Sequence, residues 1–335
     1  MGRDALTARR SLAVGVTGAS GFLGRELCAQ LSGQGHRVVR FVRPRASGPP
    51  GPARAPAPPA SGEIAWDPAR GVLDPVALAT LDAVVNLAGA GIADRPWTNE
   101  RKRELIDSRV RSTELLANAL ARACEWAHPR PGPRLLVSAS AVGWYGDRGD
   151  ETLTETSAPG TGFLAGLARR WEAAAEPARA AGVRVVHPRI GVVLWPRAGA
   201  LAKLATPFFF GAGGPLGSGR AWWSWITLPD LLGVLSFALE HDALTGACNV
   251  VAPQPVRQRD LARALGHALA RPALLPAPAF ALRALLGRER ADEMLLSSQR
   301  VLPAALLTAG FVFGDPELVP ALERIYRISR VAEAG

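Results

Sequence analysis

The sequence has few cysteines and no long apolar run, and both scarcities narrow what the protein can be. Its three cysteines, Cys28, Cys124 and Cys248, are isolated and form no C-x-x-C pair. This favours buried, reduced thiols in a cytoplasmic protein, and we predict no metal site. No stretch of about 18 or more apolar residues is free of charged and turn-forming residues, so we expect neither a membrane-spanning helix nor a membrane partner.

Lysine and tyrosine are also scarce. The 335 residues include only two lysines, Lys102 and Lys203, and two tyrosines, Tyr145 and Tyr326. Neither tyrosine is followed by a lysine four residues later. The glycine-rich segment 211–219 lacks the Lys-Ser/Thr pair that ends a P-loop, which excludes that kind of phosphate site.

Basic residues are in excess, with 39 Lys and Arg against 29 Asp and Glu and a formal net charge of +10. They are scattered and follow a general Arg-Ala-Pro-Gly bias, so we do not expect nucleic-acid binding. Arg9-Arg10 precedes an apolar segment, as in a twin-arginine export signal. That segment is also the first predicted strand, so cleavage of an export signal would remove the glycine turn. We therefore do not interpret these residues as an export signal.

The stretch that organises the chain is Thr17-Gly18-Ala19-Ser20-Gly21-Phe22-Leu23-Gly24. It follows the apolar run 12–16 and leads into leucines at helical spacing, so it predicts a strand, a tight turn and a helix. Glycine permits positive φ and lets a pyrophosphate approach the main chain, while free N–H groups at the helix N-terminus favour the anion. This context predicts a dinucleotide-binding turn.

The residue at the end of the second predicted strand indicates which dinucleotide is bound. That strand, residues 38–42, ends at Arg43, and Arg45 follows closely. A dinucleotide fold places here, about 20 residues after the glycines, the residue that meets the adenosine ribose. An acidic residue would bind the ribose hydroxyls of NAD, whereas a guanidinium suits the 2′-phosphate of NADP. We therefore predict NADP(H) as cofactor.

Alternating strand and helix patterns predict an α/β fold with a Rossmann-type, doubly wound parallel sheet and a smaller C-terminal substrate lobe. Residues 44–62 hold seven prolines and no acidic residue, and we interpret them as a flexible surface loop within one domain. We place the NADP-binding domain at residues 11–190, and the substrate lobe with a small C-terminal domain, partly returning to the sheet, at 191–330. Six strands are expected, at residues 12–16, 38–42, 63–67, 83–89, 135–137 and 183–186.

Two strand ends carry residues expected at a site, because an open sheet binds its ligand beyond the carboxyl ends of its strands. The fourth strand ends in Leu87-Ala88-Gly89, whose small residues would let a cofactor lie across it. The fifth strand runs into residues 138–146, which bring the hydroxyls of Ser140 and Tyr145 to the same edge.

Between these two strands we predict one long helix that Thr98 can cap. Its polar side includes Glu104, Ser108 and Arg109. Periodicity alone favours a solvated face for this side.

The glycine-rich segment 211–219 and the residues after it allow two interpretations. As a substrate-side loop, Arg220 with Trp222 and Trp225 would grip a planar or anionic ligand. Alternatively, the segment is a core-packed turn with a tryptophan cluster. The sequence favours neither.

As a set, these features resemble the extended, epimerase-like branch of the short-chain dehydrogenase/reductase superfamily. Residues 17–24 match its T-G-x-x-G-x-x-G fingerprint, 86–89 its fourth-strand motif and 138–146 its S-S-x-x-x-Y-G segment. Other stretches resemble a subfamily of NADP-binding epimerase family proteins, related to the human short-chain dehydrogenase/reductase family 39U member. They are Arg95-Pro96-Trp97, Phe163-Leu164 with Trp171-Glu172, residues 213–219, Trp225-Ile226-Thr227 with Asp230, and the tail 276–322, which resembles that subfamily's small C-terminal domain.

The resemblance implies a set of contacts with NADP(H) and with a substrate between the sheet's carboxyl edge and the C-terminal lobe. It also moves Glu104 and Arg109 from a solvated face to the cofactor side. The implied cofactor contacts are Thr17, Gly18, Ser20, Gly21, Phe22, Leu23, Val42, Arg43, Leu87, Ala88, Gly89, Glu104, Arg109 and Val193. On the substrate side we predict Arg220, Trp222 and Trp225.

One departure from the family pattern bears on catalysis. The superfamily uses a tyrosine four residues before a lysine, so that the ammonium lowers the phenol pKa and the phenolate serves as acid and base. In this chain Leu164 and Ala168 stand at the aligned positions. Arg169 is adjacent, but a guanidinium stays protonated and cannot shuttle protons.

Two functions therefore stay open. The first is an NADP-dependent oxidoreductase or epimerase that acts on a sugar-like or other hydroxyl or carbonyl compound, with Ser140 holding the reacting oxygen and Tyr145 as the phenol near the site. The second is an NADP(H)-binding sensor or regulatory protein with reduced or no catalysis, which the missing dyad favours. Either is compatible with an oligomer.

Overall fold

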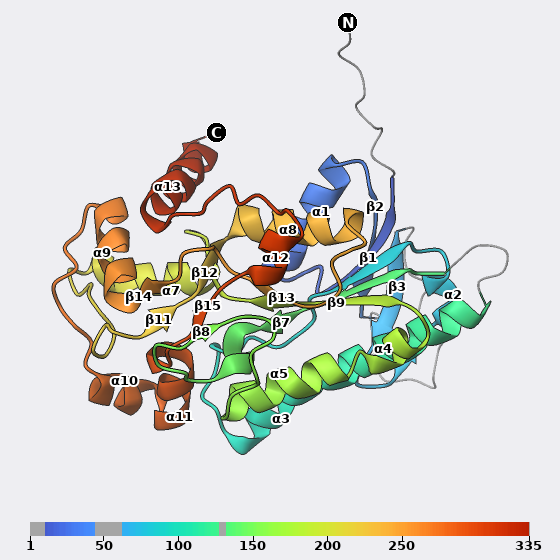
Figure 1. Ribbon diagram of the computed structural model, residues 1–335, viewed down its shortest axis with the longest axis horizontal. Helices are drawn as coiled ribbons and strands as arrows, with labels where there is room; N and C mark the ends of the chain where they lie inside the picture. The colour runs from blue at the N-terminus through green and yellow to red at the C-terminus, as the bar shows by residue number, and fades with distance from the viewer. Residues whose placement is uncertain (1–10, 44–61, 127–131, 335) are drawn as a thin grey trace, which may run out of the picture.

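The protein is built around one large, mostly parallel sheet (Figure 1). This computed structural model describes residues 11–43, 62–126 and 132–334, so most of the predicted loop at 44–62 lies outside the described residues. The strands follow the order β13-β9-β6-β5-β1-β2-β3-β4. The parallel strands are β1 (Ala13–Thr17), β2 (Arg37–Val42), β3 (Glu63–Asp67), β5 (Ala83–Asn86), β6 (Leu135–Ser138), β9 (Arg184–Ile190) and β13 (Gly246–Val250), and β4 (Val72–Leu73) is antiparallel to β3.

The order of the strands creates a crevice beside β1. Val14 of β1 lies opposite Val38 of β2 on one side and opposite Ala83 of β5 on the other. The chain adds strands in one direction up to β3 and then returns to add β5 on the far side of β1. Such a reversal opens a ligand site at the carboxyl ends of the strands. The predicted Rossmann-type fold is confirmed, and all six predicted strands are present.

Alternate residues of the central strands pack into two apolar layers. Val14 and Val16 belong to the cluster that includes residues of α1 (Phe22–Gly33) and α8 (Leu228–Glu240). Ala13 belongs to the other cluster, with residues of α4 (Val110–Trp126). Figure 1 shows α1 and α8 on one side of the sheet, with α4 and α5 (Phe163–Ala173) on the other. Burial on both faces explains why β5 is apolar at nearly every position.

The predicted long helix after β5 is two helices, which corrects the sequence-based expectation. Thr98 caps α3 (Asn99–Asp107), and its hydroxyl accepts a hydrogen bond from Arg101 N at 3.1 Å. The helix breaks before α4 because Ser108 and Arg109 bond to the preceding loop. Ser108 Oγ accepts from Ala90 N at 3.1 Å, and Arg109 Nη2 donates to Ala90 O at 2.9 Å.

The C-terminal half, residues 191–334, contributes β13 to the main sheet and α8 to one of its faces, and its other elements lie beside the sheet. Asp315 anchors its last helix, since its carboxylate pairs with Arg324 and accepts a 2.6 Å hydrogen bond from Thr227. The elements of this half are β10 (Val192–Leu194), α7 (Gly199–Phe209), β11 (Trp222–Trp223), β12 (Trp225–Thr227), β14 (Val256–Arg257), α9 (Gln258–Leu269), α10 (Ala279–Leu286), α11 (Arg288–Ala291), the π-helical turn η2 (Asp292–Leu296), β15 (Arg300–Val301), α12 (Ala304–Thr308) and α13 (Leu318–Ala334).

Short elements complete the first half. They are α2 (Pro75–Leu78), β7 (Ser140–Ala141), the 3-10 turn η1 (Val142–Tyr145), β8 (Thr152–Leu153) and α6 (Glu176–Ala180). The strand β7 extends the main sheet by pairing with β9, and β8 pairs with β15 of the C-terminal half. The two halves therefore share strand pairing as well as side-chain contacts.

The turn η2 reaches back to the first half through Glu293. Its carboxylate accepts hydrogen bonds from Phe163 N at 2.8 Å and Leu164 N at 2.7 Å, the first N–H groups of α5. Gly162, which precedes them, has φ of +100°, and a Cβ there would lie 2.8 Å from Glu293 Oε1. Glu293 thus occupies the place of a helix cap supplied from more than 100 residues away.

No helix in the described part of the chain is long and apolar enough to cross a membrane. The three cysteines are free, and Cys28 and Cys248 are buried.

Burial of His187 in β9 predicts a pH dependence of stability. Desolvation, which outweighs the attraction of Glu172, lowers the pKa of the imidazole below its ordinary value. The unfolded chain then binds the proton more readily, so the free energy of unfolding falls as the pH drops through about 6.5. We expect the variant His187→Gln to lose this component, up to about 1.4 kcal/mol per pH unit. Urea unfolding of both proteins between pH 7.5 and 5 measures it, and equal slopes would contradict the assignment.

Candidate functional site

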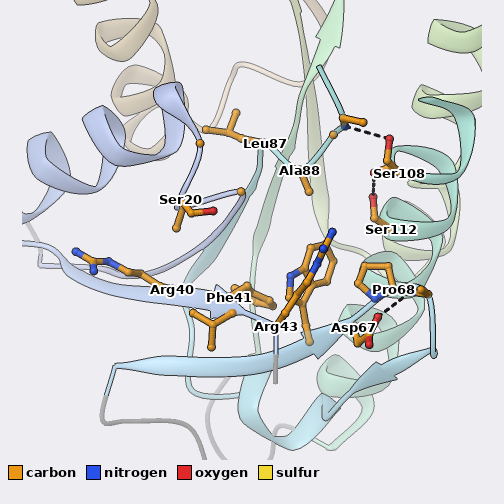
Figure 2. A pocket seen from close by; sticks show the side chains of 18 of the residues that line it. Ser20, Arg40, Phe41, Arg43, Asp67, Pro68, Leu87, Ala88, Ser108 and Ser112 are labelled. Atoms are coloured by element: carbon orange, nitrogen blue, oxygen red, sulfur yellow. Dashed lines mark hydrogen bonds between the residues drawn. The ribbon is translucent and has the colours of Figure 1, made fainter. Parts of the chain in front are cut away.

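A cavity of about 1730 Å³ lies at the carboxyl ends of β1, β2, β3 and β5 (Figure 2). It is lined by the turn 18–21, by residues 40–43 at the end of β2, by residues 67–69 after β3 and by residues 87–90 after β5. The polar sides of α3 and α4 close it. Its volume exceeds the 300–1,000 Å³ of an ordinary small-molecule pocket, so a dinucleotide fits.

The glycines of the turn have different physical roles. Gly18 has φ of +65°, and a Cβ there would lie 2.8 Å from the carbonyl carbon of Leu87. A Cβ on the buried Gly24 would lie 2.2 Å from Gly18 O, so α1 packs directly against the turn. Gly21 is exposed, and it lines the cavity. Gly18 and Gly24 are therefore required by the fold, whereas Gly21 leaves room for a ligand.

Thr17 and Asn86 hold the ends of β1 and β5 together beneath the cavity. Thr17 Oγ1 donates to Asn86 Oδ1 at 2.7 Å and accepts from Leu87 N at 3.1 Å and Ala88 N at 3.3 Å. Asn86 Nδ2 donates to Ser138 Oγ at 3.2 Å on β6. Both Thr17 and Asn86 are fully buried. Thr17 thus positions the cavity wall without lining the cavity.

The β2 side of the cavity is positively charged. Figure 2 shows Arg40 and Arg43 on this side, with Ser20 and Ser108 on other sides. Both guanidiniums are exposed, and no carboxylate of the described residues forms an ion pair with either. Arg25 adds a third guanidinium, which donates to Ser20 O at 2.7 Å. Cations of this kind, which have no carboxylate partner among the described residues, can bind an anionic ligand group.

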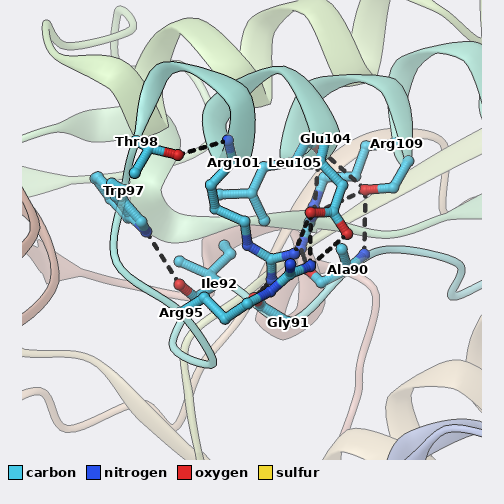
Figure 3. Close-up of polar contacts among 11 residues, drawn as sticks. Ala90, Gly91, Ile92, Arg95, Trp97, Thr98, Arg101, Glu104, Leu105 and Arg109 are labelled. Carbon is cyan, nitrogen blue, oxygen red and sulfur yellow. Dashed lines mark hydrogen bonds and ion pairs between the residues drawn. The ribbon is translucent and has the colours of Figure 1, made fainter.

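On the opposite side, Glu104 lines the cavity within a pair of guanidiniums (Figure 3). Its carboxylate lies 2.7 Å from Arg95 Nη2 and 2.7 Å from Arg101 Nη1. The hydrogen bond from Arg101, above all, lowers the pKa of Glu104, so the group is anionic at neutral pH. Arg101 also donates to Gly91 O, which ties α3 to the loop after β5.

Arg109 lies behind this wall. Its Nη groups donate to Ala90 O at 2.9 Å and Leu105 O at 3.3 Å, and its guanidinium faces the Trp171 ring at 5.1 Å. Burial lowers the pKa of Arg109 to about 10. A Cβ on Gly89 would lie 3.1 Å from its Cζ. Arg109 therefore fixes the backbone after β5 and does not itself line the cavity.

The structure brings most of the predicted cofactor residues to one cavity. Those that line it are Gly18, Ser20, Gly21, Val42, Arg43, Leu87, Ala88, Gly89 and Glu104. Five predicted residues do not. Thr17 and Arg109 are buried behind it, while Phe22, Leu23 and Val193 are half-buried and pack against the core.

Several lining residues were missed from the sequence. Arg40 was detectable, because it alternates with the apolar Val39 and Phe41 on β2 and so points away from the core. The residues after β3 gave no signal, since their place depends on how β3 pairs with β2. The missed polar residues are Arg25, Ser32, Arg40, Glu63, Asp67, Glu100, Arg103, Asp107, Ser108, Arg111 and Ser112.

Ser140 and Tyr145 both belong to a buried network beyond β6. Ser140 Oγ donates to Glu172 Oε1 at 2.7 Å, and the Glu172 carboxylate also receives Arg189 Nε at 2.8 Å and Nη2 at 2.9 Å. Arg189 Nη1 donates to the Tyr145 hydroxyl at 3.0 Å, which lies 2.7 Å from Asn249 Oδ1. Neither Ser140 nor Tyr145 lines the cavity.

The setting of Tyr145 favours a structural role for its phenol. Its side chain is fully buried, and desolvation raises its pKa despite the attraction of Arg189. Ser140 differs, since its hydroxyl hydrogen is committed to Glu172 and its oxygen can still accept a hydrogen bond. On α5, Leu164 is half-buried, Ala168 is buried and Arg169 is exposed.

The predicted substrate residues have three different settings. Trp225 is fully buried and donates to Gln254 O at 3.0 Å. The guanidiniums of Arg257 and Arg300 lie 4.0 Å and 4.7 Å from the centre of the Trp222 ring. Arg220 is exposed. The contacts of Trp225 match the interpretation as a core-packed turn, while Arg220 is free to meet a ligand.

Neighbouring glycines of this segment are also tightly packed. A Cβ on Gly214 would lie 2.1 Å from Leu275 O, and one on Gly213 would lie 2.3 Å from the Phe208 ring. Across the described residues, no three His, Cys, Asp or Glu side chains gather as metal ligands.

Comparison with known proteins agrees with this architecture. A family model described as "NAD dependent epimerase/dehydratase family" matches residues 14–250, and one described as "Domain of unknown function (DUF1731)" matches residues 277–325. An epimerase family protein of Mycobacterium leprae is 42% identical over 315 residues, which cover 94% of this chain and 96% of the relative.

Two solved structures are similar over nearly the whole chain. The crystal structure of the human epimerase family protein SDR39U1 (isoform 2) with NADPH has a TM-score of 0.79 and 34% identity, covering 94% of this chain and 99% of that one. The nucleoside-diphosphate sugar epimerase of Corynebacterium glutamicum has a TM-score of 0.73 and 33% identity, covering 97% of this chain and 62% of that one. The chain therefore belongs to the NAD dependent epimerase/dehydratase family and is related within it to human SDR39U1.

Proposed function

We propose that the protein binds NADP(H) in the cavity and uses it as an oxidoreductase or epimerase on a hydroxyl or carbonyl compound. The main support for NADP(H) as cofactor is the pair Arg40 and Arg43. Both line the cavity, both are exposed, and neither has a carboxylate partner among the described residues. Two guanidiniums without a carboxylate partner suit the 2′-phosphate that distinguishes NADP from NAD. The human relative crystallised with NADPH supports the same choice.

The residues present fit this cofactor. The turn 18–21 would hold the pyrophosphate against free N–H groups at the start of α1, and residues 87–89 would lie beside it. When bound, NADP(H) supplies or accepts the hydride. Ser140 is our candidate to hold the reacting oxygen, because its own oxygen can still accept a hydrogen bond from a substrate hydroxyl.

For Tyr145 we propose positioning in place of proton transfer. Its hydroxyl fixes Arg189, and Arg189 in turn fixes the Glu172 carboxylate that Ser140 contacts. Arg220 stays a proposed substrate contact because it is exposed. Trp222 would orient Arg257 and Arg300, whose guanidiniums lie over its ring. The three free cysteines are the ground for proposing the cytoplasm as its location.

A second candidate is an NADP(H)-binding sensor or regulatory protein with little or no catalysis. The specific observation in its favour is the burial of Ser140 and Tyr145 within one internal network. Leu164 and Ala168 supply no acid or base on α5. In this case the bound dinucleotide would change what the protein presents to a partner.

The cofactor assignment predicts that NADPH binds much more tightly than NADH. Removing either guanidinium, in Arg40→Ala or Arg43→Ala, should weaken NADPH binding about ten- to a hundredfold, the equivalent of a charge-assisted hydrogen bond of about 1.5–3 kcal/mol. NADH binding should change little. Calorimetric titration measures both. Arg37→Ala is the matched control, since Arg37 starts the same strand and does not line the cavity. Equal affinity of the native protein for the two dinucleotides would refute NADP preference.

The turn predicts different outcomes for two glycines. Gly21→Val should fold and lose dinucleotide binding, because the new side chain fills the ligand's approach, while its Cβ, 3.1 Å from Gly18 O, requires only a small shift of that carbonyl. Gly24→Val should fail to fold, because its Cβ would lie 2.2 Å from the same atom. Thermal unfolding and NADPH titration separate the two effects. A folded Gly21→Val protein with normal NADPH affinity would show that the cavity is not the dinucleotide site.

The two candidate functions differ in what a screen of carbonyl compounds shows. For an enzyme, some compounds should be reduced with consumption of NADPH, and Ser140→Ala should lower the turnover at least tenfold, about 1.4 kcal/mol of barrier. NADPH affinity should not change. Unchanged turnover in Ser140→Ala would remove Ser140 from the chemistry. Absence of any NADPH consumption, with tight binding intact, would favour the sensor.

A further inference from the structure

One end of the C-terminal half exposes a group of large apolar side chains that the cofactor cavity does not use. Phe209 and Phe210, at the end of α7, are 57% and 83% exposed. Leu274, Leu275 and Phe280, in the segment from α9 into α10, are 78%, 58% and 75% exposed. These five residues are called the apolar tip below. None of them lines the cavity.

The two segments of the apolar tip lie side by side. Leu275 N donates to Gly213 O at 3.0 Å, which joins the turn after α7 to the α9–α10 connection. A Cβ on Gly266 of α9 would lie within 3.5 Å of both Ala273 and the Phe208 ring, so the end of α7 packs against the same connection. Figure 1 shows α7, α9 and α10 together at one end of the molecule, away from β3 and α2. The side chains therefore form one surface.

The two segments that build the apolar tip carry more basic than acidic residues. Residues 191–229 and 261–288, which build it, contain no aspartate or glutamate. Their basic residues are Arg197, Lys203, Arg220, Arg263, Arg271, Arg283 and Arg288. Four of these seven pair with carboxylates that lie just outside the two ranges or on other elements: Arg283 and Arg288 with Asp292, Arg263 with Asp260, and Lys203 with Asp94. Arg197, Arg220 and Arg271 have no ion pair among the described residues. Arg271, beside the apolar side chains, is exposed.

This charge pattern selects among the possible occupants. A second copy of the chain docked tip to tip would bring the unpaired Arg271 of both copies together, which costs free energy. Protein interfaces concentrate their binding energy in tryptophan, tyrosine and arginine, whereas the tip consists of phenylalanine and leucine. Exposed phenylalanine and leucine beside an exposed arginine, here Arg271, is a composition with which peripheral proteins enter the boundary between headgroups and acyl chains.

We propose that the apolar tip docks on a membrane surface that carries anionic lipid headgroups. The apolar side chains would leave water for the acyl region, while Arg271 meets the negative surface potential of the cytoplasmic leaflet. Such docking needs no spanning helix, and the tip is assembled from two segments far apart in the chain. A search for continuous apolar runs therefore could not find it, and the proposal departs from the sequence-based expectation of no membrane partner.

Vesicle sedimentation with the full-length protein tests this proposal. We expect binding to vesicles of phosphatidylcholine with phosphatidylglycerol added, and at least tenfold weaker binding to phosphatidylcholine alone. The double variant Phe210→Ser/Leu274→Ser should lose at least tenfold in affinity for the anionic vesicles. Arg271→Glu should weaken binding as well, and added salt should do the same.

The matched control is Val76→Ser/Val312→Ser, which removes two large apolar side chains that are 60% and 85% exposed outside the tip. It should bind vesicles like the native protein. Unchanged NADPH affinity shows that each variant is folded. Vesicle binding that is absent, that ignores the anionic lipid, or that survives the tip variant would overturn the proposal. A dimer in sedimentation velocity that the tip variant converts to monomer would also overturn it, because the surface would then join two copies.

Discussion

The hydrogen bond between Thr17 and Asn86 fixes the geometry on which the cavity depends. It joins the ends of β1 and β5 at the point where the strand order reverses, and it lies in a fully buried setting. Thr17 Oγ1 also receives the N–H groups of Leu87 and Ala88, so the backbone that leaves β5 is held at a set distance from the glycine turn. Leaving one partner of a buried pair unsatisfied costs about 1–3 kcal/mol. The width of the crevice is therefore determined by side chains that never touch its contents.

A second buried network governs the neighbouring strand ends. The Arg189 guanidinium binds both oxygens of Glu172, and the side chains are 4% and 10% exposed. A buried ion pair of this kind recovers its desolvation cost only when nearly every donor and acceptor is matched, and here Ser140 and Tyr145 complete the matching. The stacking of Arg189 on the Trp144 ring at 3.8 Å adds to this. The hydroxyls beyond β6 are consequently held rigidly.

The fold and the centre of the cavity follow from local patterns in the sequence. Strand alternation, the turn around Gly18 and the small residues after β5 each carry their own signal within a few residues, and their places in the sheet follow from the rules for parallel strands. Arg43 is predictable for the same reason, because it directly ends β2.

What the sequence did not reveal depends on contacts between distant segments. Nothing local distinguishes Tyr145 as buried, since Asn249 and Arg189 enclose it from other strands. The break between α3 and α4 arises from bonds of Ser108 and Arg109 to Ala90, which periodicity within the helix cannot register. The residues after β3 line the cavity only because β3 pairs with β2 in the sheet. Local sequence patterns were enough to predict the strands and helices. Contacts between distant segments determine which side chains line the cavity.

Glu293 links the two regions of the chain that separate family models match. The segment that matches the separate C-terminal family model, residues 277–325, supplies the carboxylate that completes the start of α5, a helix of the first half. A chain that stopped before this segment would keep every strand of the main sheet and still leave the first N–H groups of α5 without that acceptor. Gly162 would keep its positive φ with no neighbour that requires it. The Glu293 carboxylate thus joins the two matched regions, and exchanging the C-terminal region between relatives preserves this contact only where residues 162 and 293 travel together.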